Sequence, residues 1–386
     1  MIARVSALLG AFGIAALAAH GQIPEGAAAP PTALPIRQTF LTSPYGWTVM
    51  GTGAKVSVVP DPLKLNSADG ALRLDYTVAP GQFGVFALPL GDGVLARAKA
   101  FRVLVRSDYA TNVVIGMQEA DGGRYLATFY VPKDKWQQVE LTPADFLLAD
   151  GPNDPKDPDD KLDLDQIRGI GLTDAAALWA QTNNTVLADL FGVKPGPHTL
   201  YLADFQINAV PLNGASGAPP APTVIDAFAH PQIGWLVLGG AEASQVSGAP
   251  LPGKGLQIHY VQAPAKASGM LRSVRKGLFT AATKLSMSVA SVKATTLLIQ
   301  VEEVDGNKYN ATVYVPAGAS KTTAVSVSFA DFKAADDSKD KTGKLDLSQV
   351  NKLLILDASG FKGDVQQETD NTLYIGDLML TRASDH

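Results

Sequence analysis

One eight-residue pattern occurs twice in this chain. The pattern Tyr-x-Ala-Thr-x-Tyr-Val-Pro spans residues 125–132 and returns at residues 309–316, and 309 less 125 is a spacing of 184. In both copies a Glu-x-Asp-Gly sequence comes just before it, at residues 119–122 and 303–306, and an apolar run comes before that. Because Gly accepts the positive φ of a tight turn, Asp-Gly between two apolar runs predicts a β-hairpin. The sequence therefore predicts the same hairpin twice.

Other landmarks repeat in the same order. The spacing between copies is 183 for Lys-Leu-Asp-Leu-x-Gln (161 and 344) and 173 for Thr-Leu-Tyr (199 and 372). Between these two motifs copy one is therefore longer by 183 less 173, or 10 residues. We expect the extra residues to be 188–197. A repeat this long exceeds the roughly 20–50 residues of a solenoid unit, so it indicates duplication of a whole domain. Two further pairs follow the same order: Gly-Trp at 46 and 234, and Ala-Asp-Phe at 144 and 330.

Length and composition agree with two β-rich domains. The chain has 386 residues, of which only 18% are charged, with 36 Gly and 25 Pro; that length accommodates two domains that each bury a core. The net charge of −5 argues against a nucleic-acid partner, because phosphate binding requires a basic surface. The chain has no cysteine, which excludes disulfides, thiolate zinc sites and a cysteine nucleophile.

The N-terminus has the pattern of a secretory signal over residues 1–19. Arg4 supplies the positive charge, residues 7–19 are apolar, and Ala-Leu-Ala at 16–18 provides a small-x-small cleavage site. The apolar run is shorter than the ~20 residues of a transmembrane helix, and no later segment is apolar enough to span a membrane. We expect a cleaved signal and a secreted, periplasmic or extracellular protein, with an uncleaved anchor as the alternative.

The rest of the chain divides into two domains. Residues 20–35, rich in Pro and Ala, are expected to form a tether, and residues 211–222 a linker. The domains then span 36–210 and 223–382, each with several short alternating strands separated by turn signals. This arrangement predicts an all-β fold of two tandem antiparallel β-sandwiches. Leu72, Leu74 and Tyr76 are expected to share one sheet face, and short helices are expected at 143–148 and 174–181.

The ordered set of motifs resembles a known family of domains. Six motifs occur in the same order in both copies: an opening strand with Gly-Trp, a Leu-x-(Asp/His)-Tyr strand, the Glu-x-Asp-Gly-x-x-Tyr hairpin, Ala-Asp-Phe, Leu-Asp-Leu-x-Gln and a closing Tyr-x-x-Asp strand. The set resembles CBM11-like carbohydrate-binding modules and the related CIA30-like domains, which are galactose-binding-like jelly rolls. The resemblance implies two tandem jelly rolls with a polysaccharide or other glycan as partner.

Strand alternation selects the candidate ligand-binding residues. Glycan binding requires aromatic faces for the sugar rings and amide or carboxylate groups for their hydroxyls. Tyr130 is expected to share a sheet face with Gln118, and Tyr314 with Gln300 and Glu302. The alternative is that both tyrosines only fill a half-buried sheet surface.

The four tryptophans leave two interpretations open. Trp47 and Trp235 are duplicated, which favours anchors in the core or at its rim, with stacking on a ligand as the alternative. Trp136 and Trp179 occur only in copy one, where they are expected either to form an exposed platform or to cap the core.

The resemblance also implies a structural calcium ion between the first and last strands of a domain. The matching carboxylates in copy two are Asp226 and Asp377, whereas copy one has Asp204 but Gln38 in the other position. Calcium takes 6–8 oxygen ligands, several of them from carboxylates or carbonyls. We therefore expect calcium in copy two only, with turn capping by these aspartates as the alternative.

No motif in the chain indicates catalysis. None of the five histidines recurs in the other copy, and nucleophile, metalloprotease and phosphate-loop patterns are missing from the sequence. The acidic stretch at 150–160 lacks the register of an EF-hand and is expected to be a solvated loop. We expect a non-catalytic carbohydrate-binding protein. The alternatives are an extracellular structural or protein-binding role, and a hydrolase or lyase. The sequence sets neither the glycan nor the oligomeric state.

Overall fold

The structure is a computed structural model that describes residues 31–60, 70–149, 154, 156–182, 185–211, 223–318, 320–336, 338, 340 and 343–383. The predicted signal at 1–19, most of the tether at 20–35 and most of the linker at 211–222 lie outside the described residues. Among the helices of the described part, none has the length and apolar composition to cross a membrane.

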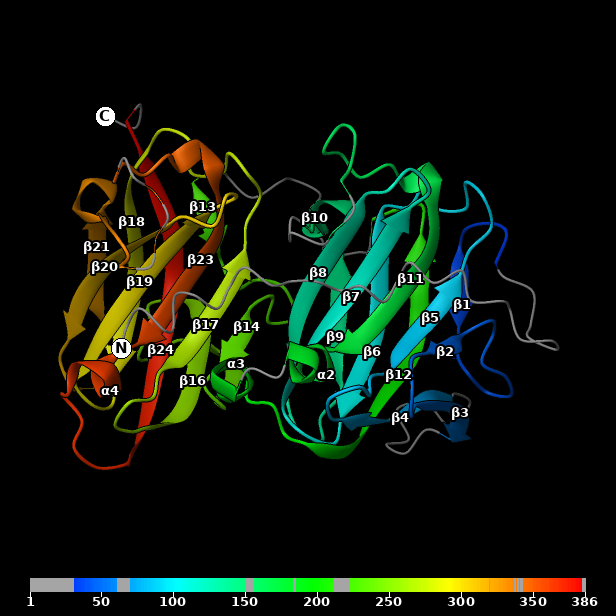
Figure 1. The fold of residues 1–386 in the computed structure, drawn as a ribbon, viewed down its shortest axis with the longest axis horizontal. Coiled ribbons are helices and arrows are strands. Elements are labelled where there is room, and N and C mark those ends of the chain that lie inside the picture. The colour runs from blue at the N-terminus through cyan, green and yellow to red at the C-terminus, as the bar shows by residue number, and fades with distance from the viewer. Residues whose placement is uncertain are drawn as a thin grey trace. The chain divides into compact units, whose positions relative to one another are not determined.

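The described strands form four antiparallel sheets of six strands each. Two sheets come from residues 36–208, which we call domain 1, and two from residues 224–382, which we call domain 2. Figure 1 shows the two sheets of each domain. The predicted domain limits, 36–210 and 223–382, stay predictions.

Domain 1 consists of sheets A1 and B1. Sheet A1 has the order β3 (Lys55–Pro60), β4 (Gly70–Val78), β12 (Gly196–Asn208), β6 (Ala100–Ser107) and β9 (Gln137–Leu141), with β1 (Ile36–Gln38) also paired to β12. Sheet B1 has the order β10 (Leu147–Leu148), β8 (Arg124–Val131), β7 (Thr111–Glu119), β11 (Ile167–Asp174), β5 (Val85–Pro89) and β2 (Thr48–Met50).

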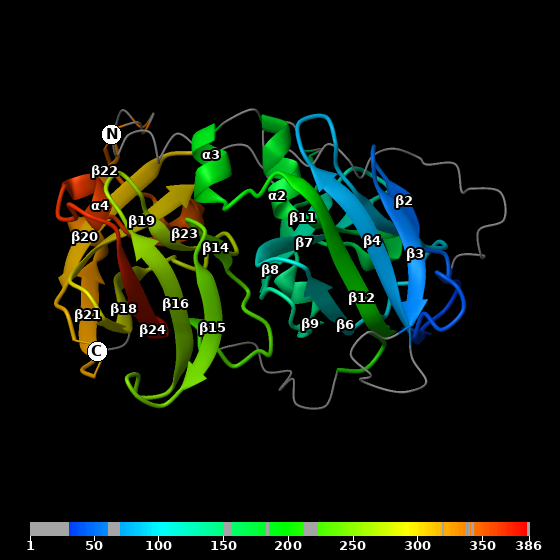
Figure 2. The ribbon, with the colours of Figure 1, turned by 90° about the horizontal axis from the view of Figure 1, so that it is seen from below.

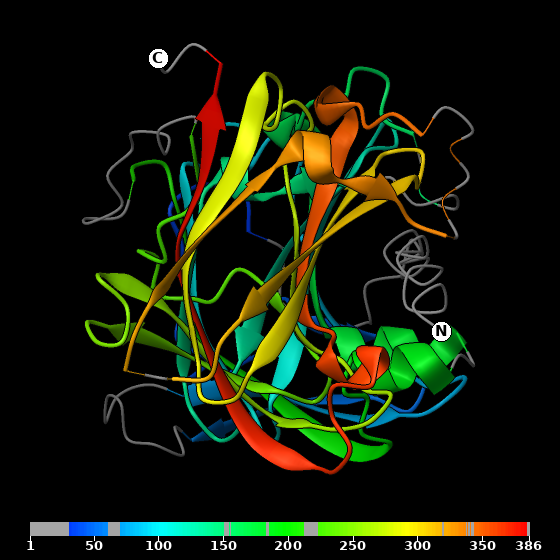
Figure 3. The ribbon, with the colours of Figure 1, turned by 90° about the vertical axis from the view of Figure 1, so that its left-hand side faces the viewer.

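Domain 2 repeats this order strand for strand, in sheets A2 and B2. Sheet A2 has the order β15 (Glu242–Ser247), β16 (Lys254–Gln262), β24 (Thr369–Arg382), β18 (Ala282–Ser291) and β21 (Thr323–Ser328), with β13 (Val224–Asp226) also paired to β24. Sheet B2 has the order β14 (Leu236–Leu238), β17 (Ser268–Ser273), β23 (Val350–Asp357), β19 (Thr295–Glu303), β20 (Lys308–Val315) and β22 (Lys333–Ala334). Figure 2 shows the strands of sheets A1 and A2, and Figure 3 shows the two layers of domain 2, with β24 in red and β23 in orange. The predicted fold class, two tandem antiparallel jelly-roll sandwiches, is confirmed.

Helices are short and sit between strands. The predicted helix at 143–148 is the 3₁₀ turn η1 (Pro143–Asp145), and that at 174–181 is α2 (Ala175–Trp179) followed by η3 (Ala180–Thr182). The remaining helices are α3 (Thr185–Leu190), α4 (Ser359–Lys362), η2 (Leu164–Gln166), η4 (Phe329–Asp331) and η5 (Leu347–Gln349).

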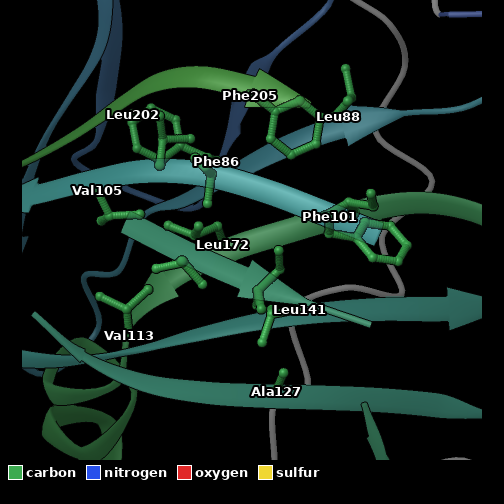
Figure 4. Close-up of a cluster of buried hydrophobic side chains, with 14 of the residues drawn as sticks. Phe86, Leu88, Phe101, Val105, Val113, Ala127, Leu141, Leu172, Leu202 and Phe205 are labelled. Carbon is green, nitrogen blue, oxygen red and sulfur yellow. The ribbon is translucent and has the colours of Figure 1, made fainter. Parts of the chain in front are cut away.

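The core of domain 1 lies between the inward faces of its two sheets. On β4, Leu72 and Leu74 are fully buried and Tyr76 is 2% exposed, whereas Arg73 and Asp75 between them point outwards, as the period of two requires. They pack against apolar side chains from both layers, several of which are labelled in Figure 4: Phe86, Leu88, Phe101, Val105, Val113, Leu172, Leu202 and Phe205. The predicted common face of residues 72, 74 and 76 is confirmed.

Both predicted hairpins form, and the repeated motifs around them bond to each other. In β7–β8 and β19–β20 the glutamate of the Glu-x-Asp-Gly motif reaches the start of the Lys-Leu-Asp-Leu segment. The backbone N–H of Asp163 donates to Glu119 Oε1 at 2.5 Å, and that of Asp346 donates to Glu303 Oε1 at 2.5 Å. The two motifs recur together because each satisfies a polar group of the other.

A buried carboxylate connects the two sheets of domain 1. Asp174, at the end of β11, is 1% exposed and accepts hydrogen bonds from the hydroxyl of Tyr76 at 2.5 Å, the hydroxyl of Thr111 at 2.6 Å and the N–H of Ala176 at 2.8 Å. The hydroxyl of Tyr109 also donates to it. Burial raises the pKa of Asp174, although these hydrogen bonds act in the opposite direction.

Domain 2 repeats this arrangement with other donors. Asp357, 2% exposed at the end of β23, accepts from the hydroxyl of Tyr260 and from Gln262 Nε2, both at 2.7 Å, and from the N–H of Ser359 at 2.9 Å. In both domains the tyrosine comes from one sheet and the carboxylate from the other.

We expect Asp174→Ala to lower the free energy of unfolding by about 3 kcal/mol, because it leaves buried hydroxyl donors without their acceptor. Chemical denaturation of the full chain measures this change. Asp92→Ala is the control: Asp92 is an exposed partner of Arg168, and such a pair contributes less than about 1 kcal/mol. Equal stability of Asp174→Ala and Asp92→Ala would contradict the role of the buried carboxylate.

Glu119 makes the stability depend on pH. Burial, with a further contribution from nearby Asp157, raises its pKa to about 7 from the ordinary value of 4.5. A raised folded-state pKa favours the protonated form, so this contribution to stability is complete below pH 4.5 and disappears as pH rises through about 7. Glu119→Gln cannot ionise at this position. As pH rises from mildly acid to mildly alkaline, we therefore expect its free energy of unfolding to increase by about 1–2 kcal/mol relative to that of wild type. Denaturation at both pH values measures this, with exposed Asp92→Asn as control, and a pH-independent difference between Glu119→Gln and wild type would refute it.

Candidate functional site

The outward face of sheet B2 carries the predicted site residues of domain 2. Along β20, Tyr309 and Val315 are fully buried on the core side, whereas Asn310, Thr312 and Tyr314 alternate to the outward side. Tyr314 is 64% exposed, the most of any large apolar side chain in the described part of domain 2. The structure therefore leaves this ring open to solvent.

Strand register brings polar side chains together on the face that carries Tyr314. On β19, Gln300 lies opposite Asn310 of β20, and Glu302 lies opposite Lys308 of β20 and Lys352 of β23. Cross-strand neighbours of this kind have Cβ atoms about 4.5–5.5 Å apart. Gln300, Glu302 and Asn310 form what we call the polar row. The predicted sharing of one face by Tyr314, Gln300 and Glu302 follows from this register.

The polar row has hydrogen-bonding atoms without partners. Gln300 is 1% exposed, and among the described residues neither its Nε2 nor its Oε1 has a hydrogen-bond partner. Glu302 Oε2 and Asn310 Oδ1 are likewise unpartnered there, while Glu302 Oε1 accepts from Lys352 Nζ at 2.7 Å. Buried polar atoms are nearly always paired, so four unpaired atoms in one row call for a specific explanation.

An apolar surface adjoins the polar row on the same face. It comes from alternate positions of β14, β17, β19 and β23, and each of its side chains is at most 5% exposed: Leu236, Leu238, Leu271, Leu298, Leu354 and Leu356. Sequence analysis missed it because residues 353–356 are apolar on both faces, which hides the period of two that marks an outward face.

The same face of domain 1 is built differently. Tyr130, the counterpart of Tyr314, is 2% exposed. Gln118 bonds within its own hairpin: Arg124 Nε donates to its Oε1 at 3.2 Å, and its Nε2 donates to the carbonyl oxygen of Gly122 at 2.6 Å. Gly116 stands where domain 2 has Gln300. Tyr130 and Gln118 do share the predicted face, but the polar row has no equivalent among the described residues of domain 1.

The predicted calcium ligands, Asp226 and Asp377, accept hydrogen bonds from protein groups. Both oxygens of Asp226 already accept hydrogen bonds: Oδ1 from the N–H of Phe228 at 2.6 Å, and Oδ2 from Trp235 Nε1 at 2.7 Å and Arg272 Nη1 at 2.5 Å. The Arg272 guanidinium neutralises this carboxylate and repels a second cation. Asp377 is exposed and accepts from Ser288 Oγ at 3.1 Å. Among the described residues, no group of three or more acidic or histidine side chains gathers as a metal site.

The tryptophans divide between core and surface. Trp47 is 2% exposed and donates to Gln38 Oε1 at 2.7 Å, as the fully buried Trp235 does to Asp226, so both are core anchors. Trp179 is also buried, at 3% exposed. Trp136 is half-buried on the outward side of sheet A1, 6.4 Å from the ring of Tyr201.

The acidic stretch at 150–160 is more structural than expected. Asp154 forms an ion pair with Arg124 at 2.6 Å, and both side chains are at most 2% exposed. Asp157 accepts a hydrogen bond from the hydroxyl of Tyr125, and in domain 2 Asp340 does so from Tyr309. The prediction of a solvated loop was wrong for Asp154 and Asp157, because their partners lie 30 or more positions away and sequence spacing does not show them.

Comparison with known proteins gives similar folds at low sequence identity. No family model matches the sequence, and no curated protein matches it. Among solved structures, a family 11 carbohydrate-binding module from Clostridium thermocellum, in complex with a beta-1,3-1,4-mixed-linked tetrasaccharide, is 16% identical over 42% of this chain and 97% of that chain, with a TM-score of 0.33. The tandem CBM22 domain of Paenibacillus barcinonensis Xyn10C is 12% identical over 92% of this chain and 100% of that chain, with a TM-score of 0.29. Family 11 modules are the domains that the motif order resembled.

We expect calcium to leave the stability of the protein unchanged, because Arg272 occupies the cationic position beside Asp226. A ligand present at about 100 times its Kd stabilises a protein by about 2.7 kcal/mol, which is readily detected. Thermal denaturation with millimolar calcium and with a chelator measures the difference. A clear rise of the melting temperature in calcium, lost in Asp226→Asn, would contradict the assignment of Asp226 to the ion pair.

Proposed function

We propose that the protein is a non-catalytic glycan-binding protein that takes a polysaccharide chain on the outward face of sheet B2. The observation that carries this proposal is the polar row: buried, unpartnered atoms on the same face as the exposed ring of Tyr314, which lies four residues from Asn310 along β20. The Gln300 amide both donates and accepts, and the free oxygens of Glu302 and Asn310 accept. Sugar hydroxyls, which donate and accept at closely spaced positions, match this set.

Tyr314 supplies the second element of a sugar site. The apolar face of a pyranose ring packs on an aromatic ring, and a tyrosine fixed in a strand loses little conformational freedom in doing so. Asn310 and Thr312 precede Tyr314 on the same strand and are half-buried and exposed, respectively. Asn310 and Tyr314 are four residues apart on β20, about 13 Å at about 3.3 Å per residue, so an oligosaccharide that runs along the strand can reach both the ring and the polar row.

The carboxylate on this face supports binding rather than hydrolysis. A glycosidase uses two carboxyl groups on opposite sides of the scissile bond. Glu302 is paired with Lys352 at 2.7 Å, which holds it as an acceptor for hydroxyls. We further propose that the protein is secreted, periplasmic or extracellular, which rests on the signal pattern of residues 1–19.

Binding of a protein partner is a second candidate function, and one observation favours it. The six leucines beside the polar row lie next to one another on the same face, and each is at most 5% exposed, which is the burial expected of an interface centre. Apolar surface of this kind is typical of the centre of a protein interface. The glycan proposal stands first because an apolar partner would leave the polar row unsatisfied.

We expect Gln300→Ala and Tyr314→Ala each to weaken polysaccharide binding about tenfold, which corresponds to about 1.4 kcal/mol. Affinity electrophoresis in gels that contain mixed-linkage β-glucan or xylan measures retention, with calcium and with chelator. Tyr130→Ala is the matched control, because this counterpart is buried and its binding should equal wild type. No retention of wild type on any polysaccharide tested would refute the proposal and leave the protein-partner function.

A further inference from the structure

Sheet A1 of domain 1 presents a row of aromatic and cationic side chains on its outward face. Arg73 of β4 lies opposite Tyr201 of β12, and Tyr201 lies opposite Arg106 of β6. Trp136, just before β9, packs against Tyr201 with ring centroids 6.4 Å apart and planes at 62°. All four side chains are half-buried, so each keeps part of its surface in solvent. We call these four residues the Tyr201 row.

Acidic neighbours hold both arginines in place. The Arg106 guanidinium lies 5.5 Å above the Tyr201 ring and 3.2 Å from the carboxylate of Asp134. Arg73 bonds Asp75 through Nη2 at 2.7 Å and Nε at 2.9 Å. A planar guanidinium fixed along one edge keeps its other N–H groups pointed in set directions. The row thus offers preorganised donors beside two aromatic rings.

Two donors of the row lack acceptors. Arg106 Nε and Trp136 Nε1 are buried at the atom level, and within the described parts of the chain neither has a hydrogen-bond partner. Both groups can only donate. A molecule that binds here must therefore supply acceptor oxygens and a face that packs on an aromatic ring.

A pocket of about 290 Å³ adjoins the row where β4 meets β3 and β12. It is lined by Lys55, Arg73, Asp75, His198 and Thr199, among others. The volume lies near the lower end of the range for small-molecule sites. Thr199 Oγ1 donates to Asp75 at 3.0 Å, so Asp75 has its carboxylate oriented from two sides.

We propose that the Tyr201 row and this pocket form a second glycan-binding surface, specific for a neutral oligosaccharide. Each arginine of the row is already paired with an aspartate, so the row offers donors and acceptors without a net charge to attract an anion. From β4 to the start of β9 is three strand spacings of about 4.8 Å, or about 14 Å. That length exceeds a single sugar ring, so the ligand is an oligomer that crosses the strands.

The surface belongs to domain 1 alone. The counterpart of Tyr201 in domain 2 is Tyr374, which lies opposite Gln257 on one side and Ala290 on the other. The tyrosine is duplicated, but the two arginines that flank it are not. Tyr374 therefore provides a control at the same fold position, and the proposal does not depend on the polar row of domain 2.

Calorimetric titration of the full chain with cellohexaose, xylohexaose and mannohexaose tests the proposal. The Gln300→Ala background weakens the site proposed on sheet B2 about tenfold, so the binding that remains strong in this background reports mainly on sheet A1. In that background we expect Tyr201→Ala and Arg106→Gln to weaken binding of one hexasaccharide at least tenfold. Two controls should have a Kd within about twofold of the background protein: Tyr201→Phe, which keeps the ring, and Tyr374→Ala. Melting curves verify that each variant is folded.

Two results would overturn the proposal. One is binding by Tyr201→Ala and Arg106→Gln that equals the Gln300→Ala background. The other is the loss of all hexasaccharide binding in that background, which would place every sugar contact on sheet B2. Equal binding by wild type and Gln300→Ala is a separate result, and it would contradict the site proposed on sheet B2.

Discussion

A buried tyrosine–carboxylate bond between the layers underlies both sandwiches. The hydroxyl of Tyr76 on sheet A1 donates to Asp174 on sheet B1, and Tyr260 on sheet A2 donates to Asp357 on sheet B2. A buried carboxylate without donors is costly, so this contact favours the packing of the two sheets in which these groups meet. This contact fixes the two layers against each other. Because side chains along a strand alternate between the two faces of a sheet, the contact also fixes which side chains face outwards.

The second anchor shows how the two copies diverged around a common geometry. Trp47 donates to the neutral amide of Gln38, and Trp235 donates to the carboxylate of Asp226. The change from amide to carboxylate adds a negative charge, which Arg272 compensates at 2.5 Å. An indole donor is satisfied in both cases. The acidic residue that resembles a calcium ligand in sequence is thus half of an ion pair.

The outward faces carry the differences between the two domains on which the proposed sites rest. On the B sheets, domain 2 has Gln300 and an exposed Tyr314, whereas domain 1 has Gly116 and a buried Tyr130. On the A sheets the asymmetry reverses, with Arg73 and Arg106 flanking Tyr201 only in domain 1. If both proposed sites bind a polymer, two weak sites on one chain raise the overall affinity through their effective concentration. Our proposals thus assign the two sites to opposite faces that diverged after the duplication.

The sequence alone determined the features that depend on local pattern. The repeated motifs gave the duplication and both hairpins, and alternation placed Tyr314, Gln300 and Glu302 on one face, since neighbouring positions in a strand set these properties. The tertiary structure decided what depends on partners distant in sequence. Arg272 lies 46 positions from Asp226, and the Tyr201 row gathers residues from four separate segments. The exposure of Tyr314 and the burial of Tyr130, two tyrosines of the same motif, differ for this reason. Burial and hydrogen-bond partners are properties of the packed chain, and a repeated motif cannot specify them.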